Sequence, residues 1–316
     1  MRSTLRAGAF GLAALIAVAA CTSGAASQAP ASATPPPSPS AASSAEPASP
    51  SASLNACAKE SLTLVSPGKL TIGTDNPAFP PYFAPKTGGN TEPWDQDQGD
   101  PTTGEGFESA VGFAIADKLG FTKDEVAWVV VPFANSFAPG PKTFDLDLNQ
   151  VAATPARAES ADLSDGYYFG PQTVVTLKTS TFAKATTIAE LQSAKFGAQV
   201  GTTSLDAINN VIKPTKEASV YDTNDAAVQA LGNKQIDALM VDLPTSDYVT
   251  NVQLDGAVVV GTLDQGTPEH FSAVLAKGSP LTACVNQAIK ALTDAGTVDS
   301  LVAKWLPFST APVLKP

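Results

Sequence analysis

The sequence predicts an α/β protein whose globular body forms two lobes. Strand-like and helix-like segments alternate over residues 69–131, and the same alternation returns over residues 195–242. A strand-helix-strand order favours parallel pairing in a layered α/β fold. The body runs from about residue 55 to the end of the chain, which is long enough for two hydrophobic cores.

The first series of elements begins with a short expected strand over residues 69–75. Residues 84–105 are rich in Gly, Pro, Thr, Asp and Asn, so we expect a long loop around Trp94. A helix is expected over residues 107–119, because apolar residues recur there on one helical face and Gly120 is a suitable C-terminal cap. Residues 126–131 are rich in β-branched side chains and predict a buried strand.

The second series predicts a strand over residues 195–200 and a helix that opens at residues 201–204. Thr223 is the expected cap of a further helix, and a strand over residues 236–241 ends at Asp242. Amphipathic helices are expected over residues 284–292 and 298–305. The pattern alone leaves open how the strands divide between the two lobes.

Residues 1–20 have the features of a secretory signal peptide. Arg2 and Arg6 provide the positive region, and the apolar run that follows is too short to span a bilayer. The run ends in Val18-Ala-Ala-Cys21, which resembles a bacterial lipobox and implies lipid attachment at Cys21. We therefore expect an extracytoplasmic protein anchored to the cell membrane by lipid; the alternative is an ordinary signal peptide with an incidental cysteine.

Residues 21–54 consist almost entirely of Ala, Ser, Pro, Thr and Gly, with Glu46 as the one charged residue. Such a segment has too little apolar bulk to offset the entropy of ordering, and its prolines keep it extended. We expect a disordered tether between the membrane and the body.

Charge and cysteine content exclude several classes of partner. Loss of Arg2 and Arg6 with the signal would take the formal net charge from −11 to −13, so nucleic acid is not an expected partner and the membrane is contacted only through the lipid. His270 is the only histidine, so a metal site is not expected. No cofactor is expected either. If Cys21 carries lipid, Cys57 and Cys284 remain as a pair in an oxidising compartment, which predicts a disulfide.

Arg157 is the only arginine outside the signal, in a chain that has sixteen lysines. Arginine differs from lysine in its planar, two-pronged recognition of carboxylate or phosphate. We therefore expect Arg157 to bind an anionic group; the alternative is a surface arginine retained by chance.

Three segments that follow expected strands have complementary chemistry. Thr154 and Arg157 come first, and Thr202 and Thr203 then open a helix, where backbone N–H groups favour an anion. Asp242 ends a strand, where α/β sheets often present a ligand group. Together these segments match the carboxylate and ammonium of an amino acid. The alternatives are a helix cap at Thr203 or Ser204 and a turn cap at Asp242.

The motifs that support a family resemblance run in one order along the chain. They are Gly73-Thr-Asp75 with Phe79-Pro-Pro-Tyr82, residues 106–120, Phe144-Asp145, Thr154-Pro-Ala-Arg157 with residues 163–168, Gly201-Thr-Thr-Ser204, residues 236–242 and Lys304-Trp-Leu306. In this order and spacing the chain resembles the extracellular solute-binding proteins of family 3, which deliver polar amino acids to ABC importers. The resemblance covers roughly residues 60–308 and implies a periplasmic-binding-protein-like type II fold with a two-strand hinge and a ligand cleft between the lobes.

The resemblance implies a role for each candidate residue. Arg157 would bind the ligand α-carboxylate, with help from Thr202 and Thr203, and Asp242 would accept from the α-ammonium. The aromatic residues Phe79 and Phe133 would sandwich the ligand side chain, while Asp75 and Gln199 would line its far end. The alternatives are core packing for the two phenylalanines and a solvent-facing position for Gln199.

The chain also departs from the family pattern. Ala152 stands where the family usually offers a hydroxyl, and the spacing between Asp75 and Phe79 is one residue longer than is typical, which leaves the reach of Asp75 open. The long loop over residues 84–105 leaves open whether Trp94 lies over the cleft.

The resemblance implies a first lobe over residues 55–178 and 265–316 and a second lobe over residues 179–264, with hinge crossings near 176–182 and 262–268. We expect a monomeric binding protein, not an enzyme, that captures a neutral or basic polar L-amino acid for an ABC permease and its cytoplasmic ATPase. The rival is an exported enzyme resembling cyclohexadienyl dehydratases, for which Asp75 and Glu108 are the candidate general acids. A receptor sensor module is a further alternative, and we see no signalling domain or spanning helix in the sequence to support it.

Overall fold

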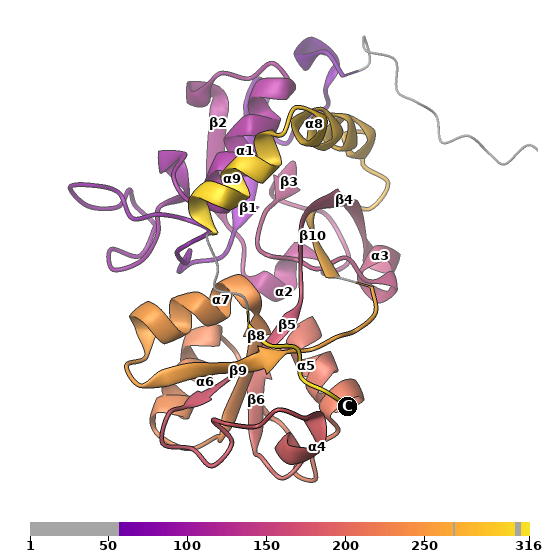
Figure 1. Cartoon of the computed structure of the whole chain (residues 1–316). Coiled ribbons are helices and arrows are strands. Elements are labelled where there is room, and N and C mark those ends of the chain that lie inside the picture. The colour runs from indigo at the N-terminus through magenta and orange to yellow at the C-terminus, as the bar shows by residue number, and fades with distance from the viewer. Residues whose placement is uncertain (1–56, 268, 307–310) are drawn as a thin grey trace, which may run out of the picture. The chain divides into compact units, whose positions relative to one another are not determined.

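A computed structural model describes residues 57–267, 269–306 and 311–316. The expected signal peptide (1–20), the lipidation position Cys21 and the tether (21–54) lie outside these residues. In the part described, the strands form two five-stranded sheets, each with its own helices and hydrophobic core (Figure 1). We call these the first lobe and the second lobe. The expected two-lobe α/β fold is confirmed.

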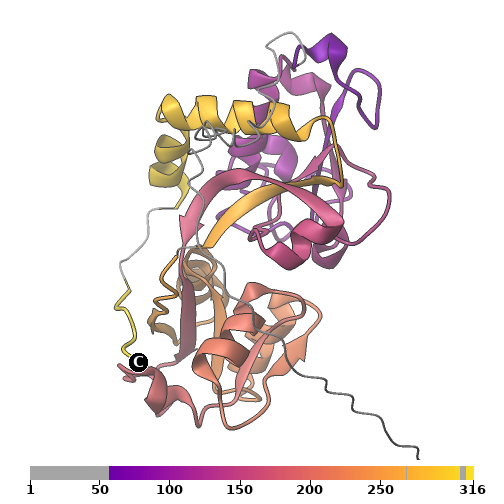
Figure 2. The same cartoon turned by 90° about the vertical axis from the view of Figure 1, so that its right-hand side faces the viewer.

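The first lobe contains a mixed sheet in the order β2-β1-β3-β10-β4. Strand β1 pairs in parallel with β2 and β3, whereas β10 runs antiparallel to β3 and β4. Figure 2 shows β4 and β10 as long neighbouring strands that curve together. The strands are β1 (Leu70–Thr74), β2 (Val126–Val130), β3 (Leu146–Asp147), β4 (Ala161–Gly170) and β10 (Glu269–Ala276).

Three helices pack on the first sheet and share its largest core. Side chains such as Ile72 of β1 and Leu275 of β10 are fully buried against them. The helices are α1 (Phe107–Lys118), α8 (Thr282–Asp294) and α9 (Thr297–Trp305), which begin and end close to the expected positions. This packing shows why apolar residues recur on one face of each of these segments.

The second lobe contains a sheet in the order β7-β6-β8-β5-β9. Strand β6 is parallel to β7 and β8, and β5 is antiparallel to β8 and β9. Both faces of this sheet are covered, because alternate residues such as Val174 and Val175 belong to different cores. The strands are β5 (Gln172–Leu177), β6 (Phe196–Gln199), β7 (Ser219–Tyr221), β8 (Ala238–Asp242) and β9 (Ala257–Thr262).

Short helical segments connect the strands, and several begin at a polar cap. Thr154, Thr202, Thr223 and Asp242 each accept a hydrogen bond from the main chain three residues later. In the first lobe the segments are η1 (Lys59–Ser61), η2 (Pro101–Thr103), η3 (Lys123–Glu125), α2 (Phe133–Ser136) and α3 (Pro155–Ser160). In the second lobe they are α4 (Ile188–Leu191), α5 (Thr203–Ala207), η4 (Ile208–Ile212), α6 (Asn224–Gly232), α7 (Leu243–Tyr248) and η5 (Val249–Gln253).

The chain crosses between the lobes near Pro171 and again between β9 and β10. Strand β4 ends in the first sheet at Gly170, and β5 starts in the second sheet at Gln172. The expected entry near 176–182, and with it the boundary at 178, therefore comes too late, because β5 pairs along its length with β8 and β9. The return lies between β9, which ends at Thr262, and β10, which begins at Glu269.

The C-terminal residues 311–316 lie on the second lobe, not on the first as expected for residues 265–316. The main chain of Thr262 donates to Pro312 O (2.8 Å) and accepts from Leu314 N (2.9 Å). Leu314 is 3% exposed and belongs to a second-lobe core. Gly261 leaves room for this contact, because a Cβ there would lie 2.7 Å from Pro312 O.

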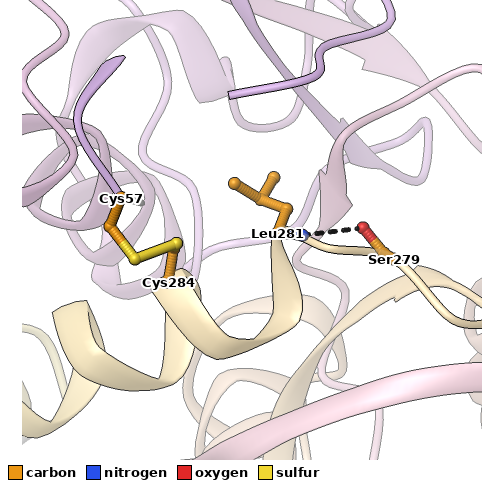
Figure 3. Close-up of a disulfide and its surroundings, with 4 residues drawn as sticks. All are labelled: Cys57, Ser279, Leu281 and Cys284. Atoms are coloured by element: carbon orange, nitrogen blue, oxygen red, sulfur yellow. Dashed lines mark hydrogen bonds between the residues drawn. A yellow bond between two sulfur atoms is a disulfide. The ribbon is translucent and has the colours of Figure 1, made fainter. Parts of the chain in front are cut away.

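The predicted disulfide between Cys57 and Cys284 is confirmed (Figure 3). The sulfur atoms are 2.05 Å apart, across 227 positions of sequence. Cys284 is buried in α8, and the bond ties the start of the described chain to that helix.

The long loop over residues 84–105 packs on the first lobe. Trp94 is 2% exposed and belongs to the first-lobe core, so its ring lies there instead of over the cleft. The carboxylate of Asp100 orders the loop by accepting from the main chain of Thr91 (2.6 Å) and Thr102 (2.9 Å). The loop touches the second lobe where the Tyr248 hydroxyl donates to Gln98 Oε1 (3.4 Å).

The C-terminal contact predicts a measurable loss of stability. Leu314→Ala should reduce the free energy of unfolding by about 2 to 5 kcal/mol, because it removes a buried side chain and leaves a cavity. Denaturant unfolding followed by circular dichroism measures this change. Val313→Ala is the matched control: Val313 is 59% exposed, and its replacement should cost less than about 1 kcal/mol. Equal losses would contradict the packing of the tail on the second-lobe core.

Candidate functional site

One pocket is lined by both lobes, at the carboxyl ends of their parallel strands. On the first lobe, the segments after β1, β2 and β3 contribute residues, and on the second lobe those at the ends of β6, β7 and β8 do so. Ligands of open α/β sheets bind at this edge. The lining residues are Asp75, Phe79, Phe133, Asn149, Gln150, Arg157, Gln172, Gln199, Thr202, Thr203, Ser204, Asn224, Val241, Asp242 and Phe271.

The pocket brings together all the candidate residues except Thr154. Thr154 instead caps α3 by accepting from Arg157 N (3.2 Å), and it lines a neighbouring groove that Arg157 also lines. His270 is also absent from the lining; its ring packs against Phe169, with centroids 5.4 Å apart. The tertiary structure thus gathers in one place residues that lie far apart in the sequence.

Arg157 is a buried cation at the junction of the lobes. It is 7% exposed, and its guanidinium donates to Ala152 O (2.6 Å) in the first lobe and to Gly201 O (2.8 Å) in the second. The rings of Phe133 and Phe137 face the guanidinium at 5.4 and 4.4 Å. The main-chain carbonyl of Ala152 thus contacts Arg157 at the position where the expected hydroxyl is missing.

Burial lowers the pKa of Arg157 to about 10, while nearby Glu269 and Asp206 act in the opposite direction. Neither carboxylate comes close enough for an ion pair with Arg157 among the described residues. The two described hydrogen bonds use two of the five guanidinium N–H donors. Arg157 therefore keeps donors at the pocket, and its charge has no ion-pair partner among the described residues.

The start of α5 is held by side chains around the pocket. Thr202 accepts from Leu205 N (3.2 Å) and donates to Gln199 O (2.8 Å). Thr203 donates to Glu269 Oε2 (2.8 Å). Gly201 has a φ of +72°, a conformation that glycine adopts without strain, and it presents its carbonyl to Arg157.

Asp242 both caps α7 and lines the pocket. Its carboxylate accepts from Thr245 N (3.0 Å) and Thr245 Oγ1 (2.9 Å). Asp242 therefore also has the capping role that the sequence left open as an alternative. It also accepts from the Tyr82 hydroxyl of the first lobe (2.5 Å). Burial is the main cause that raises the pKa of Asp242, and the hydrogen bonds from Tyr82 and Thr245 oppose it.

Asp75, Phe133 and Phe79 form the first-lobe wall. The Asp75 carboxylate accepts from Asn76 N (2.8 Å) and Phe133 N (3.2 Å), and burial raises its pKa. Phe133 packs edge-on against Phe137, with ring centroids 5.3 Å apart. Asp75 and Phe79 both reach the pocket despite their unusual spacing.

Several pocket residues were missed by sequence reasoning. Asn149 and Gln150 follow β3, whose two residues are too few to be recognised as a strand. Asn149 is 5% exposed, and its Nδ2 has no hydrogen-bond partner among the described residues. Gln172 comes just after the lobe crossing, which was expected later. The sequence signal that could have found these residues is their position after a strand. It can be used only when that strand is recognised.

Two further carboxyl groups are buried in the first lobe, beside the pocket. Glu108 accepts from the Tyr167 hydroxyl, from Gln150 N (2.8 Å) and from the Gln150 side chain. Asp147 is fully buried, neither of its oxygens has a partner among the described residues, and burial raises its pKa well above the usual value. Glu108 supports Gln150, which has a φ of +49°.

The described residues contain no group of three or more His, Cys, Asp or Glu side chains that could hold a metal ion. None of the helices in the described ranges is both long and apolar enough to cross a membrane.

Comparison with known proteins places the chain in a family. The model of the bacterial extracellular solute-binding proteins, family 3, matches residues 70–308. The chain belongs to this family, and its two-lobe α/β structure is the fold expected from the resemblance.

Sequence identity to individual relatives is low. The chain is 27% identical over 223 residues to the probable histidine-binding protein of Campylobacter jejuni, across 69% of this chain and 82% of that protein. It is 27% identical over 225 residues to the arginine-binding extracellular protein ArtP of Bacillus subtilis, across 69% and 84%. The solved structure of the substrate binding protein of an amino acid ABC transporter matches 76% of this chain and 100% of its own, with a TM-score of 0.62 and 24% identity, which shows the fold.

Glu108 predicts a pH dependence of stability. Burial raises the pKa of Glu108 to about 7 from its ordinary value of 4.5, so the folded state favours the protonated form. The resulting stabilisation is complete below pH 4.5 and is lost as the pH rises through 7. Relative to Glu108→Gln, the wild-type free energy of unfolding should therefore fall by up to about 3 kcal/mol over this range.

Urea unfolding of both proteins across that pH range measures the difference. Other titrating groups are shared by the two proteins and cancel. A difference that stays constant with pH would contradict the raised pKa of Glu108.

Proposed function

We propose that this protein captures a free L-amino acid with a neutral or basic polar side chain, without catalysis, and delivers it to an ABC transporter. The observation that carries the proposal is Arg157: a buried guanidinium that faces the pocket with free donors and no ion-pair partner among the described residues. A buried charge of this kind is costly unless it is paired. A ligand carboxylate would pair it.

The α-carboxylate would bind between Arg157 and the start of α5. The guanidinium suits two-pronged binding of a carboxylate. Thr202 and Thr203, on the second lobe, line the same pocket. Because the two sides of this subsite belong to different lobes, a bound carboxylate favours the closed arrangement by its differential contacts.

The α-ammonium would bind at Asp242. Its carboxylate lines the pocket and is held in place by Tyr82 and Thr245, so it is positioned before the ligand arrives. Burial of this carboxylate disfavours its charged form and raises its pKa. A cationic ammonium beside it would offset this cost. Arg157 and Asp242 thus offer opposite charges to the two ends of a zwitterion.

The ligand side chain would lie between Phe79 and Phe133, towards Asp75 and Gln199. Asp75 disfavours a second ligand carboxylate because the like charges would repel each other. Two relatives are named for histidine and arginine, which supports a neutral or basic side chain. Asn149, with its unpaired amide donor, adds a polar group to the same pocket.

We also propose the lipid anchor, the partners and the state of assembly. Cys21 would carry lipid, and residues 21–54 would tether the body, which rests on the sequence alone. The ligand would pass to a permease driven by a cytoplasmic ATPase; a structural relative belongs to an amino acid ABC transporter. We expect a monomer, because one chain supplies both walls of the pocket.

An exported enzyme on the same fold is the rival function, and the buried position of Glu108 argues against it. A general acid must reach the leaving group of the substrate. Glu108 does not line the pocket, and its carboxylate is already bonded to Tyr167 and Gln150. Asp75 lines the pocket and burial raises its pKa, but two main-chain N–H groups already bind its carboxylate and oppose that rise.

A ligand panel tests the proposed function. Thermal unfolding is measured with each of the common L-amino acids, and with sugars and short peptides as controls. At least one neutral or basic polar amino acid should raise the melting temperature in a concentration-dependent way, because it binds only the folded state. No shift from any amino acid, or a shift only from a sugar or a peptide, would refute the proposal.

Asp242→Asn tests the ammonium subsite. The substitution keeps the size and the capping oxygen but removes the charge, so affinity for the best amino acid of the panel should fall by about tenfold or more. Calorimetric titration should show a much smaller loss for the des-amino analogue of that ligand. Equal losses for the two compounds would contradict the assignment of Asp242.

A further inference from the structure

We propose that Glu269 is a built-in carboxylate that competes with the ligand carboxylate for Thr203, and that it thereby limits ligand affinity. This inference rests on the proposed function and adds a residue that sets the affinity of the same site. Glu269 is the first residue of β10, where the chain has returned to the first sheet.

The geometry places the Glu269 carboxylate directly behind the pocket wall. Its Oε2 accepts from Thr203 Oγ1 (2.8 Å) and from Gln172 Nε2 (3.0 Å). Thr203 and Gln172 both line the pocket, while Glu269 itself does not. A carboxylate of the protein thus already occupies donors at the place where the ligand carboxylate is expected.

A hydroxyl group has one proton to donate. The Thr203 hydroxyl donates it to Glu269, so a ligand carboxylate gains this donor only when the bond to Glu269 is broken. The amide of Gln172 is also occupied: its Nε2 donates to Glu269 and to Thr203 Oγ1 (3.4 Å), and its Oε1 accepts from Ser204 Oγ (2.7 Å). The ligand must therefore compete with Glu269 for a hydrogen bond.

The charge of Glu269 acts on the site as well. Burial lowers the pKa of Arg157, and the negative charge of Glu269 raises it. Glu269 therefore interacts electrostatically with the guanidinium. The same charge would repel a ligand carboxylate bound to Arg157. Asp206 also acts on Arg157, but it lines the neighbouring groove and makes no described bond to Thr203 or Gln172.

The Glu269 contacts also join the lobes. Glu269 belongs to a strand of the first sheet, whereas Thr203 opens a helix of the second lobe. The Thr203–Glu269 bond thus joins the two lobes through a carboxylate of the chain. Ligand binding then becomes an exchange of carboxylates, which lowers the net gain from the ligand.

Glu269→Gln tests this inference, because it keeps the size and polarity of the side chain and removes its charge. The probes are L-arginine, L-histidine and L-glutamine, each paired with its carboxamide, and the readout is the dissociation constant from calorimetric titration. Glu269→Gln should bind the amino acids about tenfold more tightly than the wild type, from the loss of one like charge near the subsite. The carboxamides, which lack the carboxylate charge, should change by less than about twofold.

Glu217→Gln is the matched control, because it makes the same change of net charge at an exposed position of the second lobe. It should leave all affinities within about twofold of the wild type. Glu269→Thr, which removes the charge with a residue suited to a strand, provides a second variant in case Glu269→Gln folds poorly.

The outcomes separate the two proposals. If none of the common L-amino acids of the ligand panel binds either the wild type or the variants, the proposed function fails, and this inference with it. If the wild type binds but the Glu269 variants bind no more tightly, or lose affinity for acid and carboxamide alike, the inference alone is overturned.

Discussion

The buried guanidinium of Arg157 is the constraint on which the rest of the site depends. A charge that is 7% exposed must be compensated, and the chain does so with a carbonyl from each lobe and two aromatic rings. Neutral carbonyls stabilise the cation without neutralising it. The site at the junction of the lobes therefore still favours an anionic ligand.

The pocket follows from the way in which the sheets are built. The parallel strands of each lobe place their carboxyl ends, and the segments after them, towards the other lobe. Many of these residues have two roles. Asp242 caps α7 and lines the pocket, and Asp75 fixes the main chain of Phe133 and lines it as well. A bound ligand therefore meets side chains whose positions are already determined by the fold, which reduces the entropy lost on binding.

Much of the site could be predicted because its residues carry distinct chemical signals. Arg157 stands out because it is the only arginine outside the expected signal, and Asp242 because it ends an expected strand. Cys57 and Cys284 stand out because they remain as a pair if Cys21 carries lipid. Tyr82, Gln172 and Glu269 could not be predicted, because their importance comes from contacts with residues far along the chain, such as the bond from Tyr82 to Asp242. Thr154 is expected in the pocket because it lies close to Arg157 in the sequence. Its side chain instead caps the start of α3 by accepting from Arg157 N.

The sequence by itself determined the classes of element, their order and the two lobes, because hydrophobic periodicity and capping residues act over short distances. Its motif order also determined the family. Only the tertiary structure decided where the chain changes lobe, which core receives Leu314, and that Glu269 meets Thr203. These outcomes depend on which strands pair and on the space left between packed elements. Both are set by contacts between distant residues, which no local pattern encodes.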